Sequence, residues 1–355
     1  MLKVGWVGAG FVGQSAHLES VSRFSDVSIE AIAELRPELS KHVCQSFDIP
    51  RSYENHQKMI ESENFDAVFV VVNRRHTFEV AFDVLSAGIN LFTEKPMAQT
   101  FEDAKKLVKI AEEKNLTYSV GYMRRYDDGV RKGRELIREL VDSGEIGNIV
   151  SVRMFVEAGS DYCGIRERIT TGELRPETST DRIAPKWIPS SYHLEYEHFV
   201  NVCGHDINLL RFLFSDEPKV VSVEYRKDGF SYVVLRFPRF SGIFEWGYRK
   251  SDVDGWRESV EVRFERGQVN INLPPAFLRN VSAQVELRRE SRPGFSRASE
   301  SIISGDFSWA FENSDRAFLD AVRKKIQADN SGLDAINDFI LIDDVWRKIL
   351  EGARK

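Results

Sequence analysis

The chain has 355 residues, 42% of them hydrophobic and 29% charged, which is typical of a water-soluble globular protein with room for two domains. No apolar run approaches the ~20 residues that cross a bilayer. The net charge of −6 argues against a nucleic-acid groove, so we expect no partner of either kind. The first residues enter a strand pattern without a signal peptide, which favours a cytoplasmic location. Three widely separated cysteines, Cys44, Cys163 and Cys203, indicate reduced thiols and no metal site.

Residues 1–122 alternate short apolar, β-branched runs with stretches of helical spacing. The expected strands are Lys3–Val7, Val27–Ala33, Asp66–Val72, Ile89–Phe92 and Leu116–Val120, and the expected helices include Thr77–Ala87 and Phe101–Glu113. Strands that are apolar on both sides and alternate with helices predict a parallel sheet covered on both faces. The fold class is therefore α/β, with a doubly wound Rossmann sheet as the first domain.

Residues 123–355 have a different pattern of apolar residues, which is typical of a second, α+β domain. A helix is expected at Arg131–Val141, and strands at Ile149–Val156, Lys219–Tyr225, Tyr232–Phe237, Ser241–Arg249, Val260–Phe264, Gln268–Leu273 and Ala283–Leu287. Strands that follow one another without helices predict a mostly antiparallel sheet. Helices return at Trp309–Ile326 and Leu333–Leu350, and these last helices can pack back on the first domain.

A glycine motif follows the first strand and precedes a helical pattern. Gly8 allows a tight turn, Gly10 lets a pyrophosphate approach the backbone, and Gly13 lets helix and strand pack closely. With Phe11 and Val12 between them, these residues are the expected dinucleotide site. The alternative is a glycine turn that holds no ligand.

Two further pairs of residues are expected near the same dinucleotide. Glu34 ends the second strand and is placed to accept from ribose hydroxyls, which favours NAD; Arg36 could pair with a 2′-phosphate, which keeps NADP possible. Asn73 ends the third strand and His76 follows it at a helix start. The alternatives are a solvated strand-end carboxylate for Glu34 and a structural cap for Asn73 and His76.

The tripeptide Glu94-Lys95-Pro96 follows the strand Ile89–Phe92, at the carboxyl edge of the sheet where such folds bind ligands. The Lys95 ammonium can donate to a substrate oxygen and stabilise a developing alkoxide. The Lys95–Pro96 peptide is a candidate cis bond. A surface charge is the alternative interpretation of Lys95.

We expect His205 to open a helix with Ile207, Leu210 and Phe214 on its apolar face. A helix N-terminus keeps an imidazole neutral and ready to take a hydroxyl proton. Its alternative is a structural histidine. Arg124 is a candidate substrate contact or an interdomain salt bridge.

Two surfaces complete the expectations. The Arg-rich stretch of roughly residues 159–195 is a candidate lid for an anionic substrate, or else a solvated loop of mixed charge. Trp246 and Tyr248 share one face of a strand, which predicts an apolar surface covered by another subunit, hence a homodimer or homotetramer.

Five segments together resemble the glucose–fructose oxidoreductase, inositol dehydrogenase and MocA (Gfo/Idh/MocA) family: Gly8–Gly13, Glu94–Ala98, Gly121–Tyr126, Ser143–Gly147 and Cys203–Arg211. The resemblance implies a Rossmann domain, a C-terminal open-faced sheet, and NAD(P)-dependent hydride transfer on a sugar, cyclitol or nucleotide-sugar. It also implies that Lys95 lies beside the reacting hydroxyl and that His205 is the acid/base.

The chain departs from the family pattern at two positions. Many family members carry Asp four residues before the histidine and again three residues after it, where this chain has Asn201 and Asn208. An amide can bind substrate but cannot take up a proton at neutral pH. Beside a dehydrogenase, two alternatives remain open: a cofactor-retaining epimerase or eliminase, and a non-catalytic NAD-sensing regulator.

Overall fold

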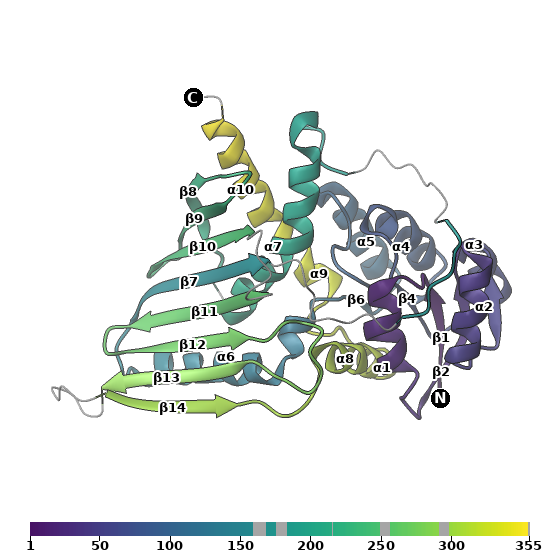
Figure 1. Ribbon diagram of the computed structural model, residues 1–355, viewed down its shortest axis with the longest axis horizontal. Helices are drawn as coiled ribbons and strands as arrows, with labels where there is room; N and C mark the ends of the chain where they lie inside the picture. The colour runs from purple at the N-terminus through teal and green to yellow at the C-terminus, as the bar shows by residue number, and fades with distance from the viewer. Residues whose placement is uncertain (159–167, 175–182, 215, 249–255, 291–297, 354–355) are drawn as a thin grey trace. The chain divides into compact units, whose positions relative to one another are not determined.

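The computed structural model describes residues 1–158, 168–174, 183–214, 216–248, 256–290 and 298–353 (Figure 1). Two compact units are present, and neither is one continuous stretch of chain. The first unit comprises Met1–Tyr122, Arg166–Asn201 and Phe311–Phe339, and the second comprises Met123–Ile165, Val202–Ala310 and Ile340–Lys355. Two segments that follow residue 122 in the sequence thus belong to the first unit. Phe311–Phe339 comes from the late helices that were expected to pack there, whereas no local pattern indicated Arg166–Asn201.

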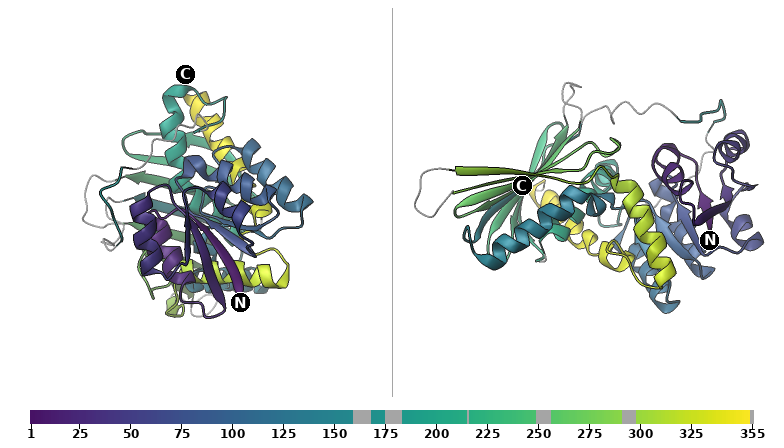
Figure 2. Two further views of the ribbon diagram at one scale, coloured as in Figure 1. Left: turned by 90° about the vertical axis from the view of Figure 1, so that its right-hand side faces the viewer. Right: turned by 90° about the horizontal axis from the view of Figure 1, so that it is seen from below.

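The first unit is built on a parallel sheet. Its elements are β1 (Leu2–Val7), η1 (Gly13–Leu18), α1 (Glu19–Val21), β2 (Val27–Ala33), α2 (Pro37–Ser46), β3 (Arg51–Tyr53), α3 (His56–Ser62), β4 (Ala67–Val70), η2 (Arg74–His76), α4 (Thr77–Ser86), β5 (Asn90–Thr93), α5 (Phe101–Glu113), β6 (Tyr118–Val120), η4 (Ser190–Tyr192) and α9 (Gly332–Ala335). The six strands lie in the order β3-β2-β1-β4-β5-β6 and all pair in parallel. Helices cover both faces of this sheet, as the left view of Figure 2 shows. The expected doubly wound Rossmann fold is confirmed.

Aromatic side chains from neighbouring strands form the centre of this unit's core. The Trp6 ring lies 5.1 Å from Phe69, and Phe69 lies 4.9 Å from Phe92, centroid to centroid, so β1, β4 and β5 contribute one stacked row. Phe318, from α8 (Ala310–Lys324), packs against Phe69 and Phe92 at 5.3 and 5.6 Å. All four side chains are fully buried, which fixes this late helix to the parallel sheet.

The second unit is built on an eight-stranded sheet. Its elements are η3 (Met123–Tyr126), α6 (Asp128–Ser143), β7 (Ile149–Ala158), β8 (Lys219–Glu224), β9 (Phe230–Arg236), β10 (Ser241–Tyr248), β11 (Arg257–Phe264), β12 (Gly267–Leu273), β13 (Gln284–Glu290) and β14 (Ala298–Ser304). The order is β14-β13-β12-β11-β7-β10-β9-β8, and every pair is antiparallel except β7 with β10. The mostly antiparallel sheet is confirmed.

Helix α6 lies along one face of this sheet (Figure 2, right). Two of its glycines permit the contact, because a Cβ on Gly129 would overlap the carbonyl of Ala283 and one on Gly133 would come within 2.7 Å of Ile271. Asp127 fixes the start of the helix by accepting from the backbone N–H groups of Val130 and Ala283. Asp127 thereby links α6 to the eight-stranded sheet.

Among the described helices, three contribute residues to both units: α7 (His193–Leu213), α10 (Asp338–Gly352) and, with its first residue Ala310 only, α8. The single helix expected over Leu333–Leu350 is instead α9 followed by α10. Within the described residues, no helix is long and apolar enough to cross a membrane.

The expected apolar surface at Trp246 is wrong. Phe244 and Trp246 are 1% and 9% exposed, so this side of β10 is already buried within the chain, and the Tyr248 side chain lies outside the described residues. Alternation along β10 instead exposes Ile243, at 44%.

Candidate functional site: the glycine-loop cavity

The glycine loop turns sharply at the carboxyl end of β1. Gly8 has φ +92°, a conformation that side chains disfavour, and a Cβ there would lie 2.5 Å from the carbonyl oxygen of Val71. A Cβ on Gly10, by contrast, would meet nothing within 4 Å. Gly8 is therefore required by the fold, whereas Gly10 leaves backbone open to an incoming ligand.

The loop borders a cavity of about 630 Å³ in the first unit. Twelve residues singled out from the sequence line it: Gly8, Gly10, Phe11, Val12, Gly13, Glu34, Arg36, Asn73, His76, Glu94, Lys95 and Asn201. Other lining residues were not predicted from the sequence, and they include Leu35, Glu54, Asn55, His56, Gln57, Arg74 and Glu79. Glu54–Gln57 were missed because they follow β3, a strand of only three residues with no apolar run that would predict it.

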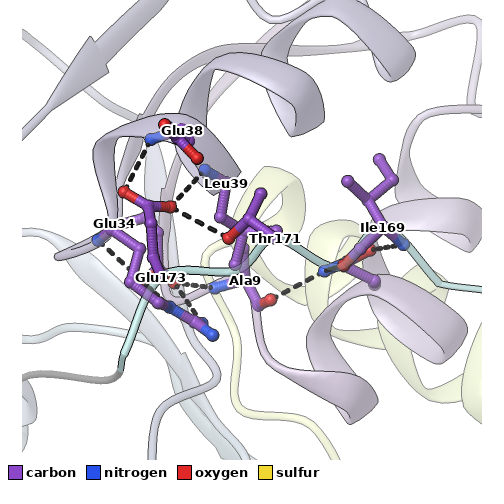
Figure 3. Close-up of polar contacts among 9 residues, drawn as sticks. Ala9, Glu34, Glu38, Leu39, Ile169, Thr171 and Glu173 are labelled. Carbon is purple, nitrogen blue, oxygen red and sulfur yellow. Dashed lines mark hydrogen bonds and ion pairs between the residues drawn. The ribbon is translucent and has the colours of Figure 1, made fainter.

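Glu34 and Arg36 are paired at the end of β2. Arg36 Nε donates to Glu34 Oε1 over 2.8 Å, and the backbone N–H of Ala9 donates to Glu34 Oε2 over 2.8 Å (Figure 3). Glu34 is 8% exposed, so the solvated-carboxylate alternative does not describe it. The carboxylate connects the glycine loop to β2, and the charge of Arg36 is already balanced.

A short segment, residues 168–174, lies against the same loop and against α2. Gln14 both donates to the Ile169 carbonyl and accepts from the Ile169 N–H. The Glu173 carboxylate accepts from the backbone N–H groups of Glu38 and Leu39, each over 2.9 Å (Figure 3). Burial alone would raise the pKa of Glu173. These hydrogen bonds and the Arg36 charge outweigh burial and hold that pKa below its ordinary value. Glu34 and Glu173 thus place two carboxylates around Arg36. Of the expected Arg-rich lid, Arg166, Arg175 and Arg182 lie outside the described residues.

Asn73 and the residues after it form the wall of the cavity beyond β4. The Asn73 side chain accepts from Arg75 N, so it is a structural cap as well as a lining residue. Arg75 pairs with both carboxylate oxygens of Glu197 over 2.7 Å. His198 is the next residue along α7. Burial is the main cause that lowers its pKa, and the Arg74 and Lys95 cations lower it further. His198 is a titratable neighbour of Lys95 that sequence reasoning missed, since no motif marks it.

Lys95 lies at the carboxyl edge of β5, and the Lys95–Pro96 peptide is cis, as the sequence suggested. Its Nζ donates to the Asn201 carbonyl oxygen over 2.8 Å and to Asn201 Oδ1 over 3.2 Å. Its backbone N–H donates to Glu94 Oε2 over 2.9 Å. Both ends of the lysine are therefore fixed, with the ammonium at the cavity.

Behind Glu94 lies a buried histidine. His17 Nε2 is 3.2 Å from Glu94 Oε1, and His17 Nδ1 is 2.7 Å from Asp315 Oδ1, on α8. Burial alone would lower the pKa of His17, but the Asp315 and Glu94 carboxylates outweigh it and raise that pKa to about 10. The side chain is consequently an imidazolium at neutral pH.

His205 does not begin a helix. It lies inside α7, twelve residues after the first residue of that helix, in the part that belongs to the second unit. The field of a helix terminus falls off within one turn, so it cannot keep this imidazole neutral. The sequence analysis missed the earlier turns because the residues before His205 have no clean apolar period.

Arg124 and Asn208 are engaged within the second unit. Arg124 is 3% exposed, donates to Glu258 and bonds the Pro274 carbonyl, so it forms a buried salt bridge. Asn208 Oδ1 accepts from Arg125 Nε over 2.6 Å. The Asn208 side-chain amide thus provides the acceptor for the buried Arg125 guanidinium, and no carboxylate is needed at this position.

The residues present fit a dinucleotide. The cavity lies at the carboxyl ends of parallel strands where the strand order changes direction, beside β1 and β4, and Gly10 leaves open backbone there. The Glu34 carboxylate lies next to the same loop, a position suited to accepting from ribose hydroxyls. Fold and site together define an NAD-binding Rossmann protein.

Comparison with known proteins gives a family match for the first part of the chain. Residues 2–122 match the model of the Gfo/Idh/MocA oxidoreductase family, described as having an NAD-binding Rossmann fold. Over these residues the chain is similar to the Gfo/Idh/MocA family, as its motifs suggested.

Curated relatives are moderately similar in sequence. The inositol 2-dehydrogenase of Salmonella typhimurium is 27% identical over 242 residues, which cover 67% of this chain and 62% of that enzyme, less than two thirds of its length. The myo-inositol 2-dehydrogenase of Thermotoga maritima is 23% identical over 281 residues, covering 76% of this chain and 74% of that one.

Solved structures share the fold over nearly the whole chain. A levoglucosan dehydrogenase in complex with NADH and levoglucosan superposes with a TM-score of 0.77 at 17% identity, covering 99% of this chain and 97% of that one. The 3-ketoreductase KijD10 of Actinomadura kijaniata, in complex with NADP and TDP-benzene, gives 0.75 at 18% identity, covering 98% and 97%.

Proposed function

We propose that the protein is an NAD-dependent oxidoreductase that moves a hydride between nicotinamide and a CH–OH carbon of a sugar, cyclitol or nucleotide-sugar. One observation carries the proposal: Lys95 lines the same cavity as the glycine loop, and its Nζ is oriented there by Asn201. The names of the relatives, inositol 2-dehydrogenase and levoglucosan dehydrogenase, supply the substrate class.

The chain's own residues would do two things in this reaction. The bound cofactor supplies the hydride acceptor or donor. The Lys95 ammonium donates to the substrate oxygen and stabilises the negative charge that develops on it. His205 takes up or returns the hydroxyl proton. It follows Asn201 by four residues in α7, a spacing that puts two side chains on one face of a helix. Arg124 has no part in this proposal, because its guanidinium is buried against Glu258.

The surroundings of Arg36 favour NAD over NADP. A 2′-phosphate would need Arg36 to leave Glu34, and it would enter a region that already holds the Glu34 and Glu173 carboxylates. Placing a negative phosphate beside two carboxylates is electrostatically unfavourable unless enough cations are present to balance all three. For this reason we place the ribose of NAD, without the extra phosphate, beside Glu34.

The other parts of the proposal concern location and assembly. We place the enzyme in the cytoplasm and expect a homodimer or homotetramer. Since the Trp246 side of β10 is buried, the sheet face with Tyr232 and Ile243, 41% and 44% exposed, is the better candidate for subunit contact. A constant monomer mass in sedimentation across concentrations would contradict an oligomer.

A substrate screen tests the function. The purified chain is supplied with NAD or NADP and, in turn, with cyclitols, hexoses, uronates and nucleotide-sugars, and reduced cofactor is followed by absorbance. We expect turnover of at least one cyclitol or sugar and a preference for NAD. Binding of NADH without turnover of any of these compounds would support a regulator instead, and turnover without net cofactor reduction would support a cofactor-retaining enzyme.

A further inference from the structure

Three ionisable side chains from distant parts of the sequence meet behind the cavity wall. His17 comes from η1, Glu94 follows β5, and Asp315 lies on α8. The side chains of His17 and Asp315 are both 0% exposed, and that of Glu94 is 12% exposed on the cavity side. His17 and Asp315 are 298 positions apart in the sequence, yet Nδ1 and Oδ1 are 2.7 Å apart.

The charges in this cluster depend on one another. With both ring nitrogens protonated, His17 donates to Asp315 on one side and to Glu94 on the other. The rings of Phe92 and Phe311 pack edge-on against the imidazole at 5.2 and 5.3 Å. Because apolar rings surround the imidazole, the charges of the cluster are only weakly screened. Removing one member of such a group leaves an uncompensated buried charge, which is strongly unfavourable.

The cluster continues to Lys95 through Glu94. Glu94 Oε1 faces His17 and Oε2 accepts from the Lys95 backbone N–H, so the two oxygens are fixed by different partners. Gly121 lies against the same carboxylate, because a Cβ there would be 2.7 Å from Glu94 Oε1. These contacts fix the orientation of the carboxylate, and that orientation holds the backbone of Lys95.

We propose that His17 and Asp315 are positioning residues for Lys95: they hold the Glu94 side chain in its orientation, and Glu94 in turn holds the lysine at the cavity. This inference rests on the proposed role of Lys95 in the reaction. Asp315 fixes the imidazole ring, His17 fixes the carboxylate, and the carboxylate fixes the lysine backbone. A helix from the C-terminal part of the chain thus contributes to the geometry of the catalytic lysine without touching substrate.

The burial of Asp315 is consistent with this geometry. Burial raises the pKa of Asp315 to about 6 against the opposing His17 cation, with Glu94 and Glu312 adding negative charge nearby. Asp315 is consequently ionised at neutral pH only because His17 is charged. Loss of the Asp315 charge would let the pKa of His17 fall towards its ordinary value, and Glu94 would lose its cationic partner as pH rises.

The test compares His17→Gln and Asp315→Asn with a control, His42→Gln, an exposed histidine on α2 outside the cavity. The first readout needs no substrate: hydrogen exchange of the Lys95 amide, with NADH affinity measured beside it. We expect exchange at least about tenfold faster in His17→Gln, with NADH affinity within about threefold of the unaltered chain. With the substrate found by the screen, kcat should fall about 10- to 100-fold, since small displacements of a reacting group cost rates of that order.

A second readout separates positioning from general damage to the fold. In Asp315→Asn, kcat should decline as pH rises through neutrality, whereas the unaltered chain and His42→Gln should show no such decline. The unaltered protein supplies a measurement that needs no variant to fold: the His17 ring, followed by NMR, should remain charged through pH 8.

Two results would overturn the inference. One is a His17 ring that titrates near 6.5 in the unaltered protein, its ordinary value. The other is normal Lys95 exchange and normal kcat in both variants while Lys95→Ala abolishes turnover, which would leave the proposed function standing. Full turnover by Lys95→Ala would instead contradict the proposed function itself.

Discussion

Lys95 Nζ donates to two oxygens of Asn201, 106 positions further along the chain. One acceptor is the backbone carbonyl, which every residue provides, and only the other is a property of the asparagine side chain. Both of these acceptors of the ammonium are neutral.

Substitution of Asn201 separates its two contributions. Asn201→Ala keeps the carbonyl, so we expect a loss in kcat/KM of less than about tenfold, near the value of one neutral hydrogen bond. Asn201→Asp adds a group that can take up a proton, so turnover should gain an acid limb in its pH profile as the new carboxylate protonates. Identical pH profiles for Asn201→Ala and Asn201→Asp would show that this position takes no part in proton transfer.

Cofactor preference is predicted to depend on Glu34 and Glu173. Glu34→Gln and Glu173→Gln each remove a negative charge beside Arg36, so the ratio of NADP to NAD affinity should rise by about tenfold, or ~1.4 kcal/mol. Glu112→Gln, an exposed change on α5, is the control. Fluorescence titration with NADH and NADPH measures the ratio. An unchanged ratio in both variants would exclude these carboxylates as its cause.

The two glycines of the loop should respond differently to alanine. Gly8→Ala forces a Cβ against the Val71 carbonyl at positive φ, so the melting temperature should fall, with a cost of roughly 1–3 kcal/mol or more. A Cβ on Gly10 would meet no atom of the described residues within 4 Å, so in Gly10→Ala stability without ligand should hold while NADH affinity drops. Calorimetry and NADH titration check the pair. Unchanged NADH affinity in Gly10→Ala would mean that the dinucleotide does not approach this backbone.

Stability should decline on the alkaline side because of His17. Its pKa is raised from 6.5 to about 10 in the folded chain, so its contribution is complete below pH 6.5 and is lost as pH rises to about 10. Asp315, raised from 3.8 to about 6, has the same sign: its contribution is complete below pH 3.8 and lost above about 6. The melting temperature should thus fall between pH 6.5 and 10, and the slope should be smaller in His17→Gln. Equal slopes would show that His17 does not carry the effect.

Local sequence patterns predicted the elements but not the long-range contacts of the site. The helix at Phe101–Glu113 and the strand at Val27–Ala33 have the expected bounds because their apolar period is regular. β14 (Ala298–Ser304) was missed, since its side chains are mostly exposed and carry little apolar signal. The His17–Asp315 contact joins residues with no local pattern between them, so only the folded chain reveals it.

The central claim is that Lys95 polarises the substrate oxygen beside a bound dinucleotide, and transient kinetics of Lys95→Ala tests it most directly. NADH affinity should stay within about threefold of the unaltered chain, while the rate of hydride transfer falls by about 10² or more, the typical loss for one electrostatic donor. Lys105→Ala, an exposed change on α5, should leave both quantities unaltered. An undiminished hydride-transfer rate in Lys95→Ala would contradict the account.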